Sequence, residues 1–152
     1  MKKSGPIIII DDDKEDLYVF HKALKELHVV NEIKLFENAR TAFEYLSGTV
    51  EPCFFILCDI NMPELNGLEL RSLLVKDDSL RVRSTPFLFL STSSQAHKVF
   101  SAYDNNSIQG YFQKPSVYED IISMFRLILN YWDASLPPRP VLPTFGGHSS
   151  NY

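Results

Sequence analysis

The chain has 152 residues, of which 45% are hydrophobic and 22% are charged, so it can bury a core, and its composition excludes disordered and fibrous proteins. Its net charge of −4 argues against a nucleic-acid-binding surface, which needs clustered lysine and arginine. The two cysteines, Cys53 and Cys58, are too few for a disulfide framework and would point to opposite faces of one short strand, which favours a reducing compartment.

The first apolar run of the chain is short. It covers only residues 6–10, and three aspartates follow it directly, whereas a signal peptide needs a longer apolar stretch. No stretch of the sequence approaches the roughly 20 apolar residues of a membrane span. Both observations predict a soluble, cytoplasmic protein.

Strand and helix patterns alternate five times along the chain. Short apolar runs mark the strands, and the β-branched run 7–10 is typical of a strand buried on both faces. Strands are expected at 7–10, 32–36, 54–58, 87–90 and 110–113. Helices, which are marked by apolar residues at helical spacing, are expected at 16–27, 38–46, 68–74, 94–103 and 117–132.

This alternation predicts an α/β fold, a doubly wound five-stranded parallel sheet with helices on both faces. After Trp132 the chain changes character, because residues 136–143 hold four of the nine prolines. We therefore expect one domain over 1–132 and an extended or disordered tail over 133–152. The tail is either a frayed terminus or a proline-rich ligand for a partner.

Polar side chains follow four of the expected strands, at the sheet edge where ligands of open parallel sheets bind. They are Asp11, Asp12 and Asp13 after the first strand, Asp59 after the third, residues 91–94 after the fourth, and Lys114 with Pro115 after the fifth. Clustered carboxylates repel one another and need a cation, for which a hard divalent ion such as Mg²⁺ is suited. One carboxylate can then act as a nucleophile toward phosphorus, while the ion, a lysine and a hydroxyl stabilise the phosphoryl oxygens.

Four segments carry a resemblance to a known family. They are Ile-Ile-Ile-Ile-Asp-Asp-Asp at 7–13, Asp-Ile-Asn-Met-Pro-Glu-Leu-Asn-Gly at 59–67, Leu-Ser-Thr-Ser at 90–93 and Gln-Lys-Pro at 113–115. In this order they resemble the receiver domain of two-component response regulators, the CheY-like superfamily, over about residues 5–132. The resemblance implies a flavodoxin-like sheet with strand order 2-1-3-4-5.

The same resemblance implies the parts of a magnesium site. Asp59 is expected to be the phosphoacceptor and a metal ligand. Asp11 and Asp12 are expected to form the acidic pair, with Asp12 the more direct ligand and Asp11 acting partly through water. Asn61 is expected to offer its backbone carbonyl to the ion.

The remaining implied residues respond to the phosphoryl group. Lys114 and the hydroxyl of Ser91 are expected to contact it, and Tyr111 is expected to change rotamer as the hydroxyl moves inward. Pro115 is expected to follow a cis Lys-Pro bond that aims the lysine at the site.

Three assignments have alternatives. Counting from Pro86 makes Ser91 the key hydroxyl, whereas counting back from Lys114 makes it Thr92; one extra residue within 104–107 would reconcile the counts in favour of Ser91. Tyr111 can simply pack at the sheet edge. Asp13 is better explained as the cap of the following helix than as a metal ligand.

The leading hypothesis is therefore a signalling switch that is not an enzyme. A phosphohistidine of a partner histidine kinase or phosphotransfer protein would phosphorylate Asp59, and the switch would alter contacts with a downstream protein or a homodimer partner. No DNA-binding segment follows, so a stand-alone regulator is expected. One alternative is a phosphatase of the haloacid dehalogenase type, which needs an aspartate where Asn61 stands; another is a receiver that binds partners without phosphorylation.

Overall fold

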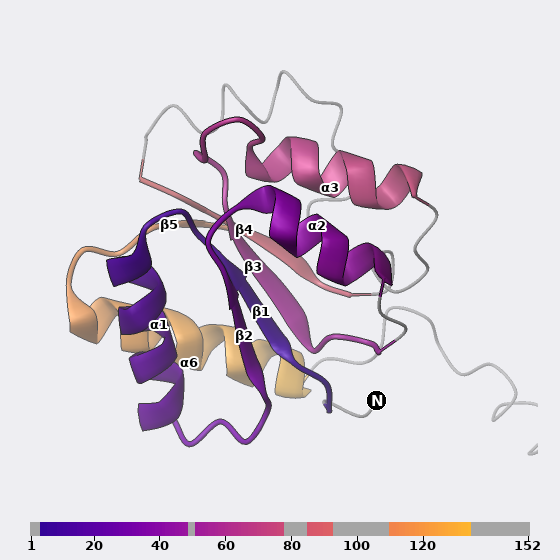
Figure 1. Cartoon of the computed structure of the whole chain (residues 1–152). Coiled ribbons are helices and arrows are strands. Elements are labelled where there is room, and N and C mark those ends of the chain that lie inside the picture. Colours follow the sequence, from indigo (N-terminus) through magenta and orange to yellow (C-terminus); the bar gives the residue numbers. More distant parts are fainter. Residues whose placement is uncertain (1–3, 49–50, 78–84, 93–109, 135–152) are drawn as a thin grey trace, which may run out of the picture.

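The computed structural model describes residues 4–48, 51–77, 85–92 and 110–134. Five strands form one parallel sheet in the order β2-β1-β3-β4-β5 (Figure 1). They are β1 (Ile7–Ile10), β2 (Ile33–Phe36), β3 (Phe55–Asp59), β4 (Phe87–Ser91) and β5 (Gly110–Gln113). The predicted α/β fold and its strand order are confirmed.

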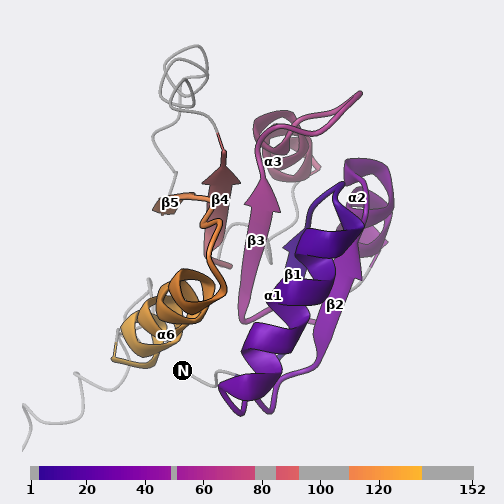
Figure 2. The same cartoon turned by 90° about the vertical axis from the view of Figure 1, so that its left-hand side faces the viewer.

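Helices cover both faces of this sheet, as the two views in Figures 1 and 2 show. Helix α1 (Lys14–Glu26) packs beside α6 (Tyr118–Ala134) on one face. Helix α2 (Ala39–Gly48) packs beside α3 (Gly67–Lys76) on the other. The chain therefore forms three layers, a central sheet between two layers of helices. The loops that carry the polar residues lie at the carboxyl ends of the strands.

The core lies on both sides of the central strands. Every residue of β1, β3 and β4 is buried, as their continuous apolar runs predict for strands covered on both faces. Because side chains alternate along a strand, Ile8 and Ile10 join the core under α2 and α3, whereas Ile7 and Ile9 join the core under α1 and α6. The central strands are thus fixed by packing from both directions.

Two local motifs set the loops at the carboxyl ends of the strands. The side chain of Asp13 caps α1 by accepting the backbone N–H groups of Glu15 and Asp16, which confirms the interpretation of Asp13 as a cap. Asn66 and Glu69 form a reciprocal capping box at the start of α3. Each motif fixes how the chain turns from a strand into the next helix.

Element bounds differ from the expected ones by a few residues. Helix α1 begins at Lys14 because Asp13 caps it, and α6 continues to Ala134. The helix expected over 94–103 and the tail over 135–152 lie outside the described residues. None of the helices in the described ranges is long and apolar enough to cross a membrane.

The expected placement of the cysteines is wrong. Cys53 precedes β3, so the alternation of that strand does not determine its direction, and it packs in the same core as Cys58. No disulfide joins these two residues.

Candidate functional site

Three carboxylates converge where β1 and β3 end. Asp11 and Asp12 follow β1, Asp59 is the last residue of β3, and one oxygen from each lies within 4.8 Å of the others. Asp11 is fully buried and Asp59 is 5% exposed, whereas Asp12 is exposed. The two strands are paired neighbours, so their register brings these side chains together. We call this cluster the acidic pocket.

Asp11 is held from two sides. Its Oδ1 accepts the backbone N–H of Asp13 at 2.9 Å, and its Oδ2 lies 2.6 Å from the Nζ of Lys114. Burial raises the pKa of Asp11 to about 6, although the ammonium group of Lys114 acts in the opposite direction. The carboxylate is therefore costly to keep charged without a nearby cation.

Asp59 has fewer stabilising contacts. Its Oδ1 accepts the backbone N–H of Asn61 at 3.1 Å, and its Oδ2 lies 3.5 Å from the Nζ of Lys114. Burial raises its pKa, and the positive charge of Lys114 offsets part of that effect. Asp59 thus lies beside a lysine while its Oδ2 is not engaged in a short ion pair.

Lys114 reaches the acidic pocket from the end of β5. Its backbone N–H donates to the carbonyl of Ser91 at 2.7 Å, which extends the β4–β5 pairing by one residue. Burial alone would lower its pKa, but the hydrogen bonds and charges of Asp11, Asp16 and Asp59 outweigh burial and raise it. The side chain therefore remains a cation at neutral pH.

Asp16 is a contact that the sequence did not reveal. Its Oδ2 lies 2.8 Å from the Nζ of Lys114, although it belongs to α1 rather than to a strand end. The signal that could have identified it is its place in the first turn of α1, which begins at Lys14 directly after the Asp13 cap and so lies at the same edge of the sheet.

The hydroxyl candidates differ in position. Ser91 is the last residue of β4 and is fully buried, and its Oγ lies 3.4 Å from Nδ2 of Asn61. Thr92 follows the strand and is exposed. Ser91 thus contacts the loop after Asp59, in agreement with the count from Pro86.

The family model of the response regulator receiver domain matches residues 7–126. The chain belongs to this family. It is 25% identical over 130 residues to the probable methanogenesis regulatory protein FilR2 of Methanothrix harundinacea, covering 83% of this chain and 82% of that protein. It is 29% identical over 126 residues to the transcriptional regulatory protein CrdR of Helicobacter pylori, covering 82% of this chain and 54% of that protein.

Solved structures agree with this assignment. A response regulator receiver domain from Rhodospirillum rubrum is 26% identical, with a TM-score of 0.69, and the match covers 88% of this chain and 96% of that one. The phosphorylated cyanobacterial phytochrome response regulator RcpA shares the fold, with 22% identity, a TM-score of 0.72, and coverage of 90% and 99%. Phosphorylation and magnesium binding at an acidic pocket are general features of receiver domains, as are contacts with histidine kinases or phosphotransfer proteins and with downstream targets.

One implied feature of this receiver domain is wrong. The peptide bond between Lys114 and Pro115 is trans, because no described peptide bond is cis. The trans form is the more stable one for an X-Pro bond by about 0.5–1 kcal/mol. The lysine nevertheless reaches the acidic pocket, since its backbone is fixed by the hydrogen bond to Ser91.

Tyr111 lies on the edge strand of the receiver domain. It is opposite Phe89 in the β4–β5 register and its side chain is 40% exposed. This position suits both interpretations, a residue packed at the sheet edge and a residue that changes rotamer. Its switching role stays a prediction.

The residues of the acidic pocket fit a magnesium ion. Asp11, Asp12 and Asp59 offer carboxylate oxygens, which are the ligands that Mg²⁺ prefers. The Oδ2 atom of Asp11 is buried and lies 2.6 Å from the Nζ of Lys114. A metal ion bound to this carboxylate would share it with the lysine, and the Asn61 carbonyl is expected as a further ligand.

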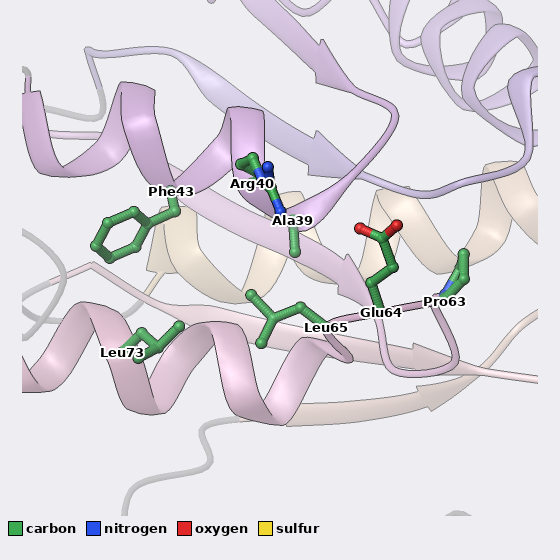
Figure 3. Close-up of a pocket in the computed structure, with 7 residues that line it drawn as sticks. All are labelled: Ala39, Arg40, Phe43, Pro63, Glu64, Leu65 and Leu73. Carbon is green, nitrogen blue, oxygen red and sulfur yellow. The ribbon is translucent and has the colours of Figure 1, made fainter.

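A separate groove lies between α2 and α3 (Figure 3). Leu73 lines it from α3, Ala39 and Phe43 line it from α2, and Glu64 and Leu65 come from the loop after β3. None of the three carboxylates of the acidic pocket lines this groove. The groove is thus distinct from the candidate phosphorylation site.

Proposed function

We propose that Asp59 is the phosphoacceptor of this receiver domain and that it takes a phosphoryl group from a phosphohistidine of a partner kinase or phosphotransfer protein. The observation that carries this proposal is the position of the Lys114 ammonium, 2.6 Å from Asp11 and 3.5 Å from Asp59. One cation and three carboxylates therefore surround the place where a phosphoryl group would be held. Buried carboxylates grouped with a cation and with shifted pKa values are typical of functional sites.

The proposed reaction is a simple displacement. A carboxylate oxygen of Asp59 forms a bond to phosphorus while the bond between phosphorus and the histidine nitrogen breaks. The departing imidazole keeps the electron pair of that bond and takes a proton from water. Asp59 is suited to attack because its Oδ2 lies 3.5 Å from the Nζ of Lys114, farther than the Oδ2 of Asp11 at 2.6 Å, and so forms no short ion pair.

The residues around Asp59 would stabilise the negative charge of the phosphoryl oxygens. Lys114 can place positive charge on one phosphoryl oxygen, and the Ser91 hydroxyl can donate a hydrogen bond to another. Bound Mg²⁺ would add positive charge against the remaining oxygens, with Asp11, Asp12, Asp59 and the Asn61 carbonyl as its ligands. These roles explain why the pocket combines acidic residues with a buried cation.

We further propose that the output passes through protein contacts near β5 and α6. Tyr111 on β5 and Leu127 and Tyr131 on α6 are exposed, and β5 is joined to the pocket through Lys114. A change at the phosphorylated residue would therefore bias the position of this edge strand and of the surface beside it. A downstream protein or a second copy of the chain could read that surface.

Labelling by a small phosphodonor tests the acceptor. The purified chain is incubated with acetyl phosphate and Mg²⁺, and its intact mass is followed over time. We expect one phosphoryl adduct on the wild type and on Asp120→Asn, which changes an exposed aspartate of α6, and none on Asp59→Asn. An adduct that persists in Asp59→Asn would reject this acceptor.

The same experiment distinguishes a phosphoacceptor from a phosphatase. A haloacid dehalogenase-type enzyme needs a general acid two residues after its nucleophile, and Asn61 cannot transfer a proton from its amide. We therefore expect slow release of about one phosphate per adduct and no turnover of phosphate monoesters. Sustained hydrolysis of a phosphate monoester would favour the enzyme.

A further inference from the structure

Lys114 is shared among three carboxylates at unequal distances. Its Nζ lies 2.6 Å from Oδ2 of Asp11, 2.8 Å from Oδ2 of Asp16 and 3.5 Å from Oδ2 of Asp59. Its side chain is only 8% exposed, so these interactions are weakly screened by water. The ammonium is therefore closer to Asp16 than to the proposed phosphoacceptor.

Helix α1 fixes the position of Asp16. The Oδ1 atom of Asp13 accepts the backbone N–H groups of Glu15 at 2.9 Å and of Asp16 at 3.4 Å, which orders the first turn. A carboxylate in the first turn is also favoured by the helix dipole. The helix is attached to α6 through an edge-to-face contact between Phe20 and Phe125. Asp16 is thus carried by an element packed into the core.

Lysine and a divalent cation compete for the same atoms. Oδ2 of Asp11 contacts Lys114, and Asp11 also belongs to the group of three carboxylates that can hold a metal ion. Two cations on one carboxylate repel each other. If Asp11 and Asp59 were the only partners of Lys114, both partners would be metal ligands. The ammonium would then move closer to Asp59 than the present 3.5 Å.

Asp16 offers Lys114 a carboxylate outside that group of three. We propose that Asp16 is a positioning residue, which holds the Lys114 ammonium on the α1 side of the acidic pocket, 3.5 Å from Asp59, and so leaves Asp59 accessible to a divalent cation. The inference rests on the proposed function, because it assigns Asp16 to the same site. It predicts that Asp16 affects metal binding through Lys114 rather than by touching the metal.

Calorimetric titration of the full chain with Mg²⁺, without a phosphodonor, tests this role. We expect Asp16→Ala to weaken Mg²⁺ binding by about three- to tenfold, the size of one partly exposed charge interaction. Asp16→Asn keeps an acceptor oxygen and should lose less. Glu15→Ala is the matched control, because it removes an exposed carboxylate from the same turn, and it should change binding by less than about twofold.

A double-mutant cycle separates positioning from a long-range charge effect. In a Lys114→Met background the ammonium is gone, so Asp16→Ala should weaken Mg²⁺ binding by less than about twofold. An equal loss in both backgrounds, or no loss in the wild-type background, would overturn the proposal. Far-ultraviolet circular dichroism checks that each variant is folded.

The side-chain ammonium can also be observed directly. The buried Lys114 ammonium should give a slowly exchanging ¹⁵N–H₃⁺ resonance. We expect its chemical shift to change in Asp16→Ala, where the ammonium would move from Asp16 toward Asp59, but not in Glu15→Ala. An unchanged resonance in Asp16→Ala would contradict the positioning role. Mg²⁺ binding and the Lys114 resonance are measured without phosphorylation. The positioning role of Asp16 can therefore be rejected while Asp59 is still labelled by acetyl phosphate. It can equally hold if Asp59 is not labelled.

Discussion

The central strands and the edge strand β5 contribute to the site in different ways. Strands β1 and β3 are buried along their whole length; Asp11 directly follows β1, and Asp59 is the last residue of β3. Strand β5 alternates between partly buried and exposed residues, and it leads into Lys114. The carboxylates are therefore fixed by packing from two faces, whereas the cation comes from a strand that packing holds less firmly.

This difference suits a switch. Carboxylates that bind a metal ion must keep their geometry, so they belong on strands that cannot shift without opening the core. A residue that responds to a new phosphoryl group must move at low cost, so it belongs on an edge. Tyr111, which is 40% exposed, lies on the edge strand, where we expect such a response.

The largest expected effect comes from removing core packing beneath the carboxylates. Ile56 of β3 is fully buried, so Ile56→Ala should lower the free energy of unfolding by about 2–5 kcal/mol. Tyr111→Ala on β5 should lower it by less than about 1 kcal/mol, because the residue is partly exposed. Urea unfolding of both variants measures the two losses, and equal losses would show that the two strands are held alike.

A pH effect of about 2–3 kcal/mol is expected from Asp11. Its pKa is about 6 in the folded chain, against an ordinary value of 3.8, so the folded state binds a proton more tightly than the unfolded state. Without divalent ions this contribution is fully present below pH 3.8 and is lost as the pH rises through about 6. The expected change in the free energy of unfolding is the pKa difference multiplied by about 1.4 kcal/mol per pKa unit, and this product is an upper limit.

Asp11→Asn provides the control for that titration. The variant cannot ionise at this position, so its free energy of unfolding should exceed that of the wild type by more at pH 7.5 than at pH 4.5. Lys114 stays protonated throughout, because the surrounding carboxylates raise its pKa. Urea unfolding in the presence of a chelator gives the difference, and parallel pH profiles for the two proteins would contradict the assignment to Asp11.

A smaller effect is expected where α3 approaches the end of β3. A Cβ added to Gly67 would lie 2.5 Å from the carbonyl oxygen of Asp59, closer than such atoms can approach. Gly67→Ala should therefore lower the free energy of unfolding by about 1–3 kcal/mol and slow the labelling of Asp59. Gly48→Ala is the matched control, since nothing lies within 4 Å of its added Cβ. A stable Gly67→Ala that labels normally would show that the strand end can shift.

The sequence predicted the fold and most of the site because both depend on local patterns. The buried strands appear as unbroken apolar runs, and the first polar residue after each run falls at the sheet edge where ligands bind. Asp11, Asp59 and Lys114 could be found in this way. Their partner Asp16 could not, since its direction depends on how the Asp13 cap orients the first turn of α1.

Other errors have the same origin in three-dimensional context. The direction of Cys53 depends on a segment before β3 rather than on strand alternation. The isomer of the bond between Lys114 and Pro115 depends on a small free-energy difference that sequence does not reveal. The choice between Ser91 and Thr92 is a different case, because it is no error: the sequence leaves it open, since the two counts start from opposite ends of a loop.

The smallest expected effect comes from the choice between Ser91 and Thr92. It also tests most directly whether the buried or the exposed position contacts the phosphoryl group. Ser91 is fully buried at the end of β4 and contacts Asn61, whereas Thr92, one residue later, is exposed. Ser91→Ala should slow labelling by acetyl phosphate by about tenfold, the loss of one hydrogen bond of about 1.4 kcal/mol to a phosphoryl oxygen. Thr92→Ala should change the rate by less than about twofold. The reverse order of the two rates would make Thr92 the working hydroxyl and would mean that the end of β4 turns toward the phosphoryl group when Asp59 is modified.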